Sequence, residues 1–114
     1  ADKKEAEALI AEECKALGLL QARNRRRPAE SPPVREYFMH GVAHPIGLDV
    51  HDVLQPGQKI AAGWVLTCEP AIYIRREGFG IRLENTVLVT SQGVEDLMAD
   101  IPIEPEEIEA LMRR

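Results

Sequence analysis

The sequence lacks the features that mark several common classes of protein. It has two cysteines, Cys14 and Cys68, which form no closely spaced pair, so neither a disulfide framework nor a zinc ribbon is indicated. It has no excess of positive charge, because its formal net charge is -5, and this disfavours nucleic acid as a partner. It has no apolar run long enough to cross a membrane. We expect a cytoplasmic protein without a membrane partner, with both thiols free and buried.

What the sequence does contain is an ordinary globular balance. Of 114 residues, 45% are hydrophobic and 29% are charged, which fits one small folded domain or part of a larger one. The sequence begins with Ala1 and enters a helical pattern almost at once. We therefore expect a processed or excised piece of a longer protein.

The first part of the chain predicts a helix followed by a loop. Residues 2–17 favour a helix that Asp2 could cap and Gly18 could end, with a stripe at helical spacing made by Ala6, Leu9, Ile10 and Leu17. Residues 21–36 are basic and contain three prolines, so this stretch predicts a mobile loop.

The remainder predicts short strands and a closing helix. Residues 37–99 form the region that we expect to hold the site, with strands at 64–69, 71–74, 81–84 and 86–90 because these runs are rich in β-branched and aromatic residues. Residues 104–113 predict a helix, since Pro105 suits a first turn.

All three histidines lie close together, at His40, His44 and His51. A single histidine is most often a hydrogen-bonded surface residue. Their clustering, with Gly41 and Gly47 allowing a close backbone approach, favours a ligand site instead. A site made by the three histidines alone remains one alternative.

Two glutamates stand in apolar, strand-like surroundings, Glu69 after VLTC and Glu84 after GIRL. If buried in neighbouring strands, their carboxylates would repel each other unless a cation lay between them. They could instead face water or pair with Arg82. One imidazole and two carboxylates suit Mn, Fe, Co or Zn.

Three motifs in the same order resemble the Xaa-Pro aminopeptidase and prolidase family. They are residues 38–52 (FMHGVAHPIGLDVHD), residues 63–74 (GWVLTCEPAIYI) and residues 80–90 (GIRLENTVLVT), and the ending at 102–109 (PIEPEEIE) is also similar. The resemblance implies an α+β fold, namely the carboxy-terminal half of a pita-bread fold, with a curved antiparallel sheet and flanking helices. It makes residues 1–114 a partial catalytic metallopeptidase domain.

The resemblance also implies a metal site. His44, Glu69 and Glu84 would be ligands of two divalent ions, Mn first, with Co or Zn as alternatives. Arg82 would steady the carboxylates from outside the ligand shell.

The catalytic residues implied in the same way are His40, His51 and Glu69. His51 would contact the substrate and help to stabilise the tetrahedral intermediate, and His40 would assist in binding or proton transfer. Glu69 would also be a candidate general base. The reaction would be hydrolysis of the bond between an amino-terminal residue and proline in a peptide substrate.

The sequence departs from the family pattern in one serious way. Pro45, Ala62 and Ala71 are tolerable differences from the residues common there, but the two aspartate ligands of the family have no counterpart before His40, where Asp2 is the only aspartate. We therefore expect an incomplete site and a chain that is inactive without an amino-terminal half as its partner. The complete protein would be a homo-oligomer. The alternative is a non-catalytic binding or interaction module of the same fold.

Overall fold

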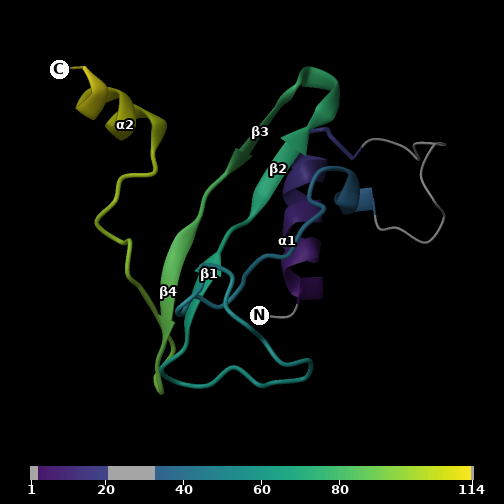
Figure 1. The fold of residues 1–114 in the computed structure, drawn as a ribbon. Coiled ribbons are helices and arrows are strands. Elements are labelled where there is room, and N and C mark those ends of the chain that lie inside the picture. The colour runs from purple at the N-terminus through teal and green to yellow at the C-terminus, as the bar shows by residue number, and fades with distance from the viewer. Residues whose placement is uncertain (1–2, 21–32, 114) are drawn as a thin grey trace. The chain divides into compact units, whose positions relative to one another are not determined.

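The computed structural model describes residues 3–20 and 33–113 (Figure 1). The chain divides into two compact units. Unit 1 comprises Ala1–Val42 and Glu69–Arg82, and unit 2 comprises Ala43–Cys68 and Leu83–Arg114. Each unit is described by itself.

Unit 1 begins with helix α1, Lys3–Ala16, which lies inside the range expected from the sequence. Gly18 ends it with a φ of 73°, and its N–H donates to the carbonyl of Lys15 at 2.9 Å. The expected apolar stripe is wrong in two places, because Leu9 is 71% exposed and Leu17 is 64% exposed. Cys14 is the buried residue of α1 instead. The expected cap, Asp2, lies outside the described residues.

A short 3-10 helix, η1, covers Pro33–Glu36, where the sequence had predicted loop. That prediction is wrong for these four residues, because a proline fits a first helical turn and Val34 anchors the turn by burial. The N–H of Phe38 donates to the carbonyl of Val34 at 2.8 Å. The rest of the expected loop, residues 21–32, lies outside the described residues.

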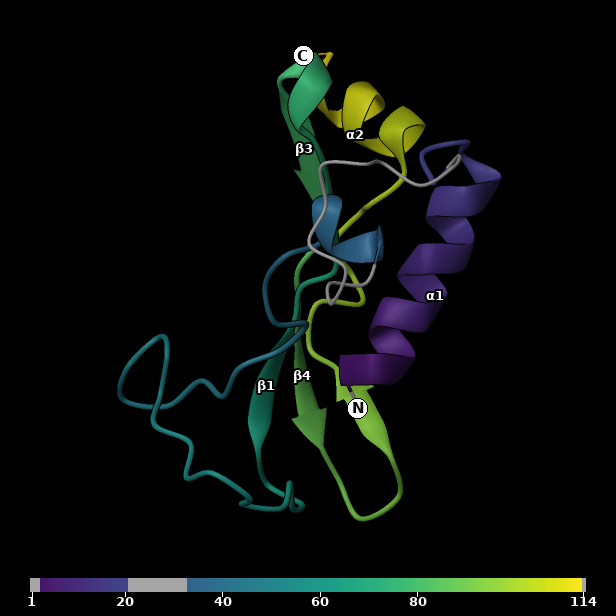
Figure 2. The ribbon, with the colours of Figure 1, turned by 90° about the vertical axis from the view of Figure 1, so that its right-hand side faces the viewer.

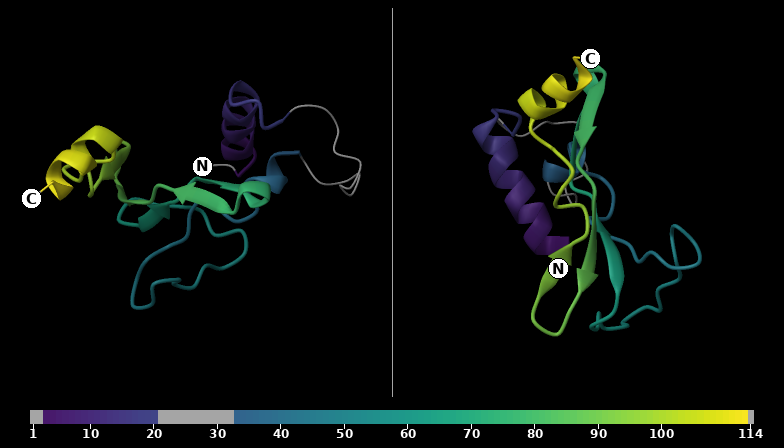
Figure 3. Two further views of the ribbon diagram at one scale, coloured as in Figure 1. Left: turned by 90° about the horizontal axis from the view of Figure 1, so that it is seen from above. Right: turned by 90° about the vertical axis from the view of Figure 1, so that its left-hand side faces the viewer.

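Strands β2 (Ala71–Ile74) and β3 (Phe79–Arg82) form an antiparallel hairpin in unit 1. A 3-10 turn, η2 (Arg75–Glu77), and Gly78 with a φ of 73° join them. Alternation along β2 directs Ala71 and Tyr73 to the face covered by α1 and η1. Figures 1 and 3 show α1 beside this hairpin. The core there consists of Val34, Phe38 and Ala71, with Ile10, Ala11, Val42 and Tyr73 packed against it.

Unit 2 is built on a three-stranded antiparallel sheet in the order β1-β4-β5. These strands are β1 (Val65–Cys68), β4 (Asn85–Val89) and β5 (Val94–Asp96) (Figure 2). The sequence did not predict β5, which has three residues, two of them acidic. The expected strand 81–84 is also displaced, since β3 ends at Arg82 and Glu84 lies in the link to β4.

The segment around His44 runs along β1 in unit 2. Pro45 forms an isolated antiparallel bridge with Leu66, and the N–H of Thr67 donates to the carbonyl of His44 at 2.9 Å. The N–H of Ile46 donates to the carbonyl of Val65 at 3.0 Å. These bonds fix the histidine segment to a strand that β4 holds from its other edge.

Helix α2, Pro105–Met112, is the last element of unit 2 and is drawn in yellow in Figure 3. Its proline lies in the first turn. Helices and antiparallel strands together make the predicted α+β class. Cys68 is exposed, so the prediction of two buried thiols is wrong for it: it is the last residue of β1, beyond the buried residues Leu66 and Thr67. Among the described residues, no helix has the length and apolar character that crossing a membrane requires.

Candidate metal centre

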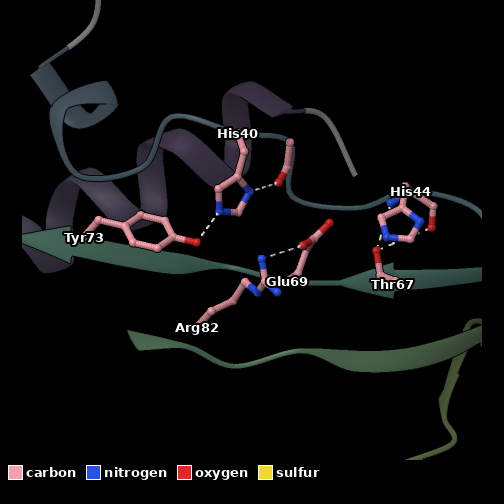
Figure 4. A network of polar contacts seen from close by, with 7 residues as sticks. His40, His44, Thr67, Glu69, Tyr73 and Arg82 are labelled. Carbon is pink, nitrogen blue, oxygen red and sulfur yellow. Dashed lines mark hydrogen bonds and ion pairs between the residues drawn. The ribbon is translucent and has the colours of Figure 1, made fainter. Parts of the chain in front are cut away.

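His40 is held by two hydrogen bonds within unit 1. Its Nδ1 lies 2.6 Å from the carbonyl oxygen of Gly41, and its Nε2 lies 3.0 Å from the hydroxyl of Tyr73 (Figure 4). A carbonyl only accepts, so Nδ1 carries a proton, and in the neutral form of the ring Nε2 accepts from the hydroxyl of Tyr73. The ring also meets Phe38 edge-on, with centroids 4.8 Å apart. The tautomer of His40 is thus set by its neighbours.

Glu69 follows β1 in the chain and belongs to unit 1, where its N–H donates to the carbonyl of Val42 at 2.8 Å. Its side chain is 14% exposed, and its Oε2 lies 3.7 Å from Nη1 of Arg82 (Figure 4). The guanidinium and the largely buried carboxylate thus form an ion pair at long range. The structure therefore places Arg82 beside one of the two glutamates that the sequence singled out.

His44 is held in unit 2 by both backbone and side-chain bonds. Its N–H donates to Oγ1 of Thr67 at 2.9 Å, and its Nδ1 donates to the carbonyl of Pro45 at 2.9 Å. With the proton on Nδ1, the lone pair of the neutral imidazole lies on Nε2. A metal-binding histidine commonly has this arrangement, in which the second nitrogen is tied to a backbone carbonyl.

His51 lies next to His44, with ring centroids 4.4 Å apart and the rings tilted by 57°. The backbone at Asp52 returns to the backbone at Pro45, because the N–H of Asp52 donates to the carbonyl of Pro45 at 3.2 Å. The structure thus brings two of the three histidines together in unit 2, whereas His40 belongs to unit 1.

The proposed ligands divide between the units, with His44 and Glu84 in unit 2 and Glu69 in unit 1. Within neither unit do three or more described histidine, cysteine, aspartate or glutamate side chains form a group that could hold a metal ion. The structure brings His51 beside His44 and Arg82 beside Glu69. The convergence of the three proposed ligands stays a prediction. The donor chemistry still fits a metal, since the set offers an imidazole Nε2 and carboxylate oxygens.

Two residues that support the site carry no role in the sequence interpretation. Thr67 is 2% exposed and holds the backbone of His44, while Tyr73 holds the ring of His40. A hydroxyl inside the apolar run VLTC was a signal for the first. No pattern marks the second, since its partner lies 33 positions away in the chain.

Comparison with known proteins gives the class to which this fold and these residues belong. The model of metallopeptidase family M24 matches residues 3–91. The chain is 46% identical over 90 residues to the Xaa-Pro aminopeptidase of Escherichia coli, an alignment that covers 68% of this chain and 20% of the relative.

Solved structures that resemble this chain belong to enzymes of the same kind. A candidate aminopeptidase P from Bacillus anthracis is 41% identical, with a TM-score of 0.81 over 97% of this chain and 25% of that one. The zinc-substituted aminopeptidase P of E. coli, solved with product, is 34% identical, with a TM-score of 0.72 over 96% of this chain and 27% of that one.

The chain belongs to metallopeptidase family M24. Both the resemblance and the fold class predicted from the sequence are confirmed. The chain spans about a fifth of the length of its E. coli relative and about a quarter of the solved chains.

Proposed function

We propose that this chain is the carboxy-terminal part of the catalytic domain of a metal-dependent Xaa-Pro aminopeptidase. Membership of family M24, through a match over residues 3–91, carries the proposal. The names of the relatives give the substrate class, a peptide whose second residue is proline. The protein would act in the cytoplasm, as a homo-oligomer when complete.

The metal would be held by His44 through Nε2 and by the carboxylates of Glu69 and Glu84, with two aspartates from an amino-terminal part completing the shell. The hydrogen bond from Nδ1 of His44 to Pro45 supports this role, because it directs the lone pair to the other ring nitrogen. When bound, a pair of divalent ions, Mn first with Co or Zn as alternatives, would supply Lewis acidity and lower the pKa of a water molecule.

The other residues of this chain would handle protons and charge. Glu69 would take the proton of the attacking water, and Arg82, whose Nη1 lies 3.7 Å from Oε2 of Glu69, would orient that carboxylate. His51, beside His44, would donate to the oxygen that becomes negative in the tetrahedral intermediate. His40 would lie at the edge of the pocket and assist in substrate binding or proton transfer.

The test combines metal titration with peptide hydrolysis. Calorimetry with Mn²⁺, Co²⁺ and Zn²⁺ should show tight binding only when the amino-terminal part is supplied together with this chain. Hydrolysis of an Xaa-Pro peptide should follow the same requirement, and the chain alone should be silent. Glu69→Gln and Glu84→Gln should each weaken metal binding by at least tenfold, since each removes a charged ligand.

Glu77→Gln is the matched control, because Glu77 lies at the tip of the hairpin in an exposed pair with Arg76. It removes the same charge at a place without a proposed role. Failure of the completed domain to bind any of the three ions would overturn the proposal. Unchanged affinity in both Gln variants would favour a site made by the three histidines instead.

A further inference from the structure

Gly80 occupies the place in β3 that faces the ring of Tyr73. The two residues are cross-strand partners in the β2–β3 hairpin. A Cβ atom added at Gly80 would come within 2.5 Å of Cδ1 of Tyr73 and 3.1 Å of the carbonyl oxygen of Ile72. Real Cβ atoms do not approach a ring carbon so closely, so the ring of Tyr73 occupies the space that a side chain at position 80 would need.

The constraint on Gly80 is steric. The glycines with positive φ are Gly18, Gly57, Gly63, Gly78 and Gly93, and Gly80 is not one of them. An alanine could therefore adopt the extended backbone of β3 without conformational strain. The larger part of its cost would come from the ring of Tyr73 at 2.5 Å, and a smaller part from the carbonyl oxygen of Ile72 at 3.1 Å.

The tyrosine cannot yield by moving its backbone without breaking other bonds. Its N–H donates to the carbonyl of Tyr37 at 2.8 Å, and β2 pairs with β3 over its four residues. The ring would have to swing instead. The hydroxyl of Tyr73 lies at the end of the ring, 3.0 Å from Nε2 of His40. A displaced ring would therefore lose the hydrogen bond between this hydroxyl and His40.

We propose that Gly80 is a positioning residue for His40: by leaving room for the Tyr73 ring across β3, it lets the tyrosine hydroxyl hold the imidazole with its proton on Nδ1. The bond from Nδ1 to the carbonyl of Gly41 completes that arrangement. The inference rests on the proposed function only for the place of His40 in a substrate pocket. Its test uses no metal and no catalysis, so the two proposals fail separately.

The test is ¹⁵N NMR of the histidine rings of the chain at a pH where the imidazoles are neutral. The wild-type chain should show His40 with a protonated Nδ1 and an unprotonated, hydrogen-bonded Nε2. Gly80→Ala and Tyr73→Phe should shift the Nε2 signal to a similar extent. The double variant should shift it no further than Tyr73→Phe alone, because both changes act through one hydroxyl.

Ile81→Ala is the control, since Ile81 neighbours Gly80 in β3, alternates to the opposite face and is 64% exposed. It should leave the His40 signals in place. Unchanged His40 signals in Gly80→Ala would overturn the proposal. So would an equal shift in Ile81→Ala, or an undiminished further shift when Gly80→Ala is added to Tyr73→Phe.

A second measurement covers the case in which Gly80→Ala unfolds unit 1. If the conflict is with the ring, truncating the ring should remove it. The fall in the denaturation midpoint caused by Gly80→Ala should therefore be smaller in a Tyr73→Ala background than in the wild-type chain. An equal fall in both backgrounds would show that position 80 acts independently of Tyr73, and the proposal would be wrong.

Discussion

The hydroxyl of Thr67 joins β1 to the histidine segment at the level of one residue. It accepts the N–H of His44 at 2.9 Å, and the side chain is buried. Thr67→Val conserves shape but leaves that N–H without its acceptor in a half-buried place. The substitution should cost about 1–3 kcal/mol of unfolding free energy, the penalty for an unsatisfied donor.

Urea denaturation measures this cost, and Thr86→Val serves as its control. Thr86 is the cross-strand partner of Thr67 on β4, and it contributes its N–H, not its hydroxyl, to the bond with Sδ of Met98. The control should change stability by clearly less. Equal losses in both variants would contradict the role given to the Thr67 hydroxyl.

Cys14 couples stability to pH. Burial raises the pKa of its thiol, and the negative charge of Glu13 acts in the same direction. The folded chain therefore keeps this proton at pH values where the unfolded chain releases it. Stability from this source is complete below the ordinary thiol pKa of about 8.5 and is lost as pH rises through that value toward the raised one.

The free energy of unfolding, measured between pH 7 and 10, should fall over the upper part of that range. Cys14→Ser should flatten this part of the curve, because the serine hydroxyl does not titrate there. Cys68→Ser should leave it unchanged, since Cys68 is exposed. A slope that survives in Cys14→Ser would assign the effect to other groups.

At the scale of elements, unit 1 depends on the contact of η1 and its following residues with β2. Phe38 is 1% exposed and packs with Val34 and Ala71. Phe38→Ala would leave a cavity between these elements and should cost about 3–5 kcal/mol. The neighbouring Met39 is 41% exposed, so Met39→Ala should have little effect.

Thermal denaturation followed by far-ultraviolet circular dichroism compares these two variants. The Phe38→Ala chain should also lose the protection of amide protons in β2, because that strand rests on the aromatic ring. A loss of stability in Met39→Ala as large as in Phe38→Ala would contradict the specific role given to the buried ring of Phe38.

Elements with strong local signals could be predicted from the sequence, and those made by distant contacts could not. Gly18 and Pro105 mark helix ends by backbone chemistry alone, and α1 and α2 lie within the expected ranges. Strand β5 escaped prediction because pairing with β4, not its own acidic sequence, makes it extended. The 3-10 turn at Pro33–Glu36 likewise depends on the burial of Val34.

The same division holds for the site. Motif order pointed to His44, Glu69 and Glu84, and these residue types suit a metal. The partners that orient the histidines, Thr67 and Tyr73, lie 23 and 33 positions from them, and only the fold joins such residues. Whether the three ligands converge depends on the placement of two units, which no local pattern determines.

At the scale of the whole chain, much apolar surface lies uncovered. In the hairpin, alternation directs Phe79 and Ile81 to the face opposite the core, and they are 51% and 64% exposed. In unit 2, large apolar side chains that are at least half exposed include Val94, Leu97, Ile101, Ile103, Leu111 and Met112. A monomer rarely leaves so many of them open to water.

We expect the chain by itself to bind an apolar dye and to associate as its concentration rises, because association removes apolar surface from water. Light scattering and dye fluorescence measure the two effects. Replacing both Phe79 and Ile81 by threonine keeps β propensity while reducing apolar area, so dye binding should fall and association should need a higher concentration. Glu77→Gln, in the turn η2 that joins β2 and β3, should change neither dye binding nor association. A monodisperse monomer that binds no dye would mean that the exposed side chains cover one another in solution, and a longer partner would then be unnecessary for stability.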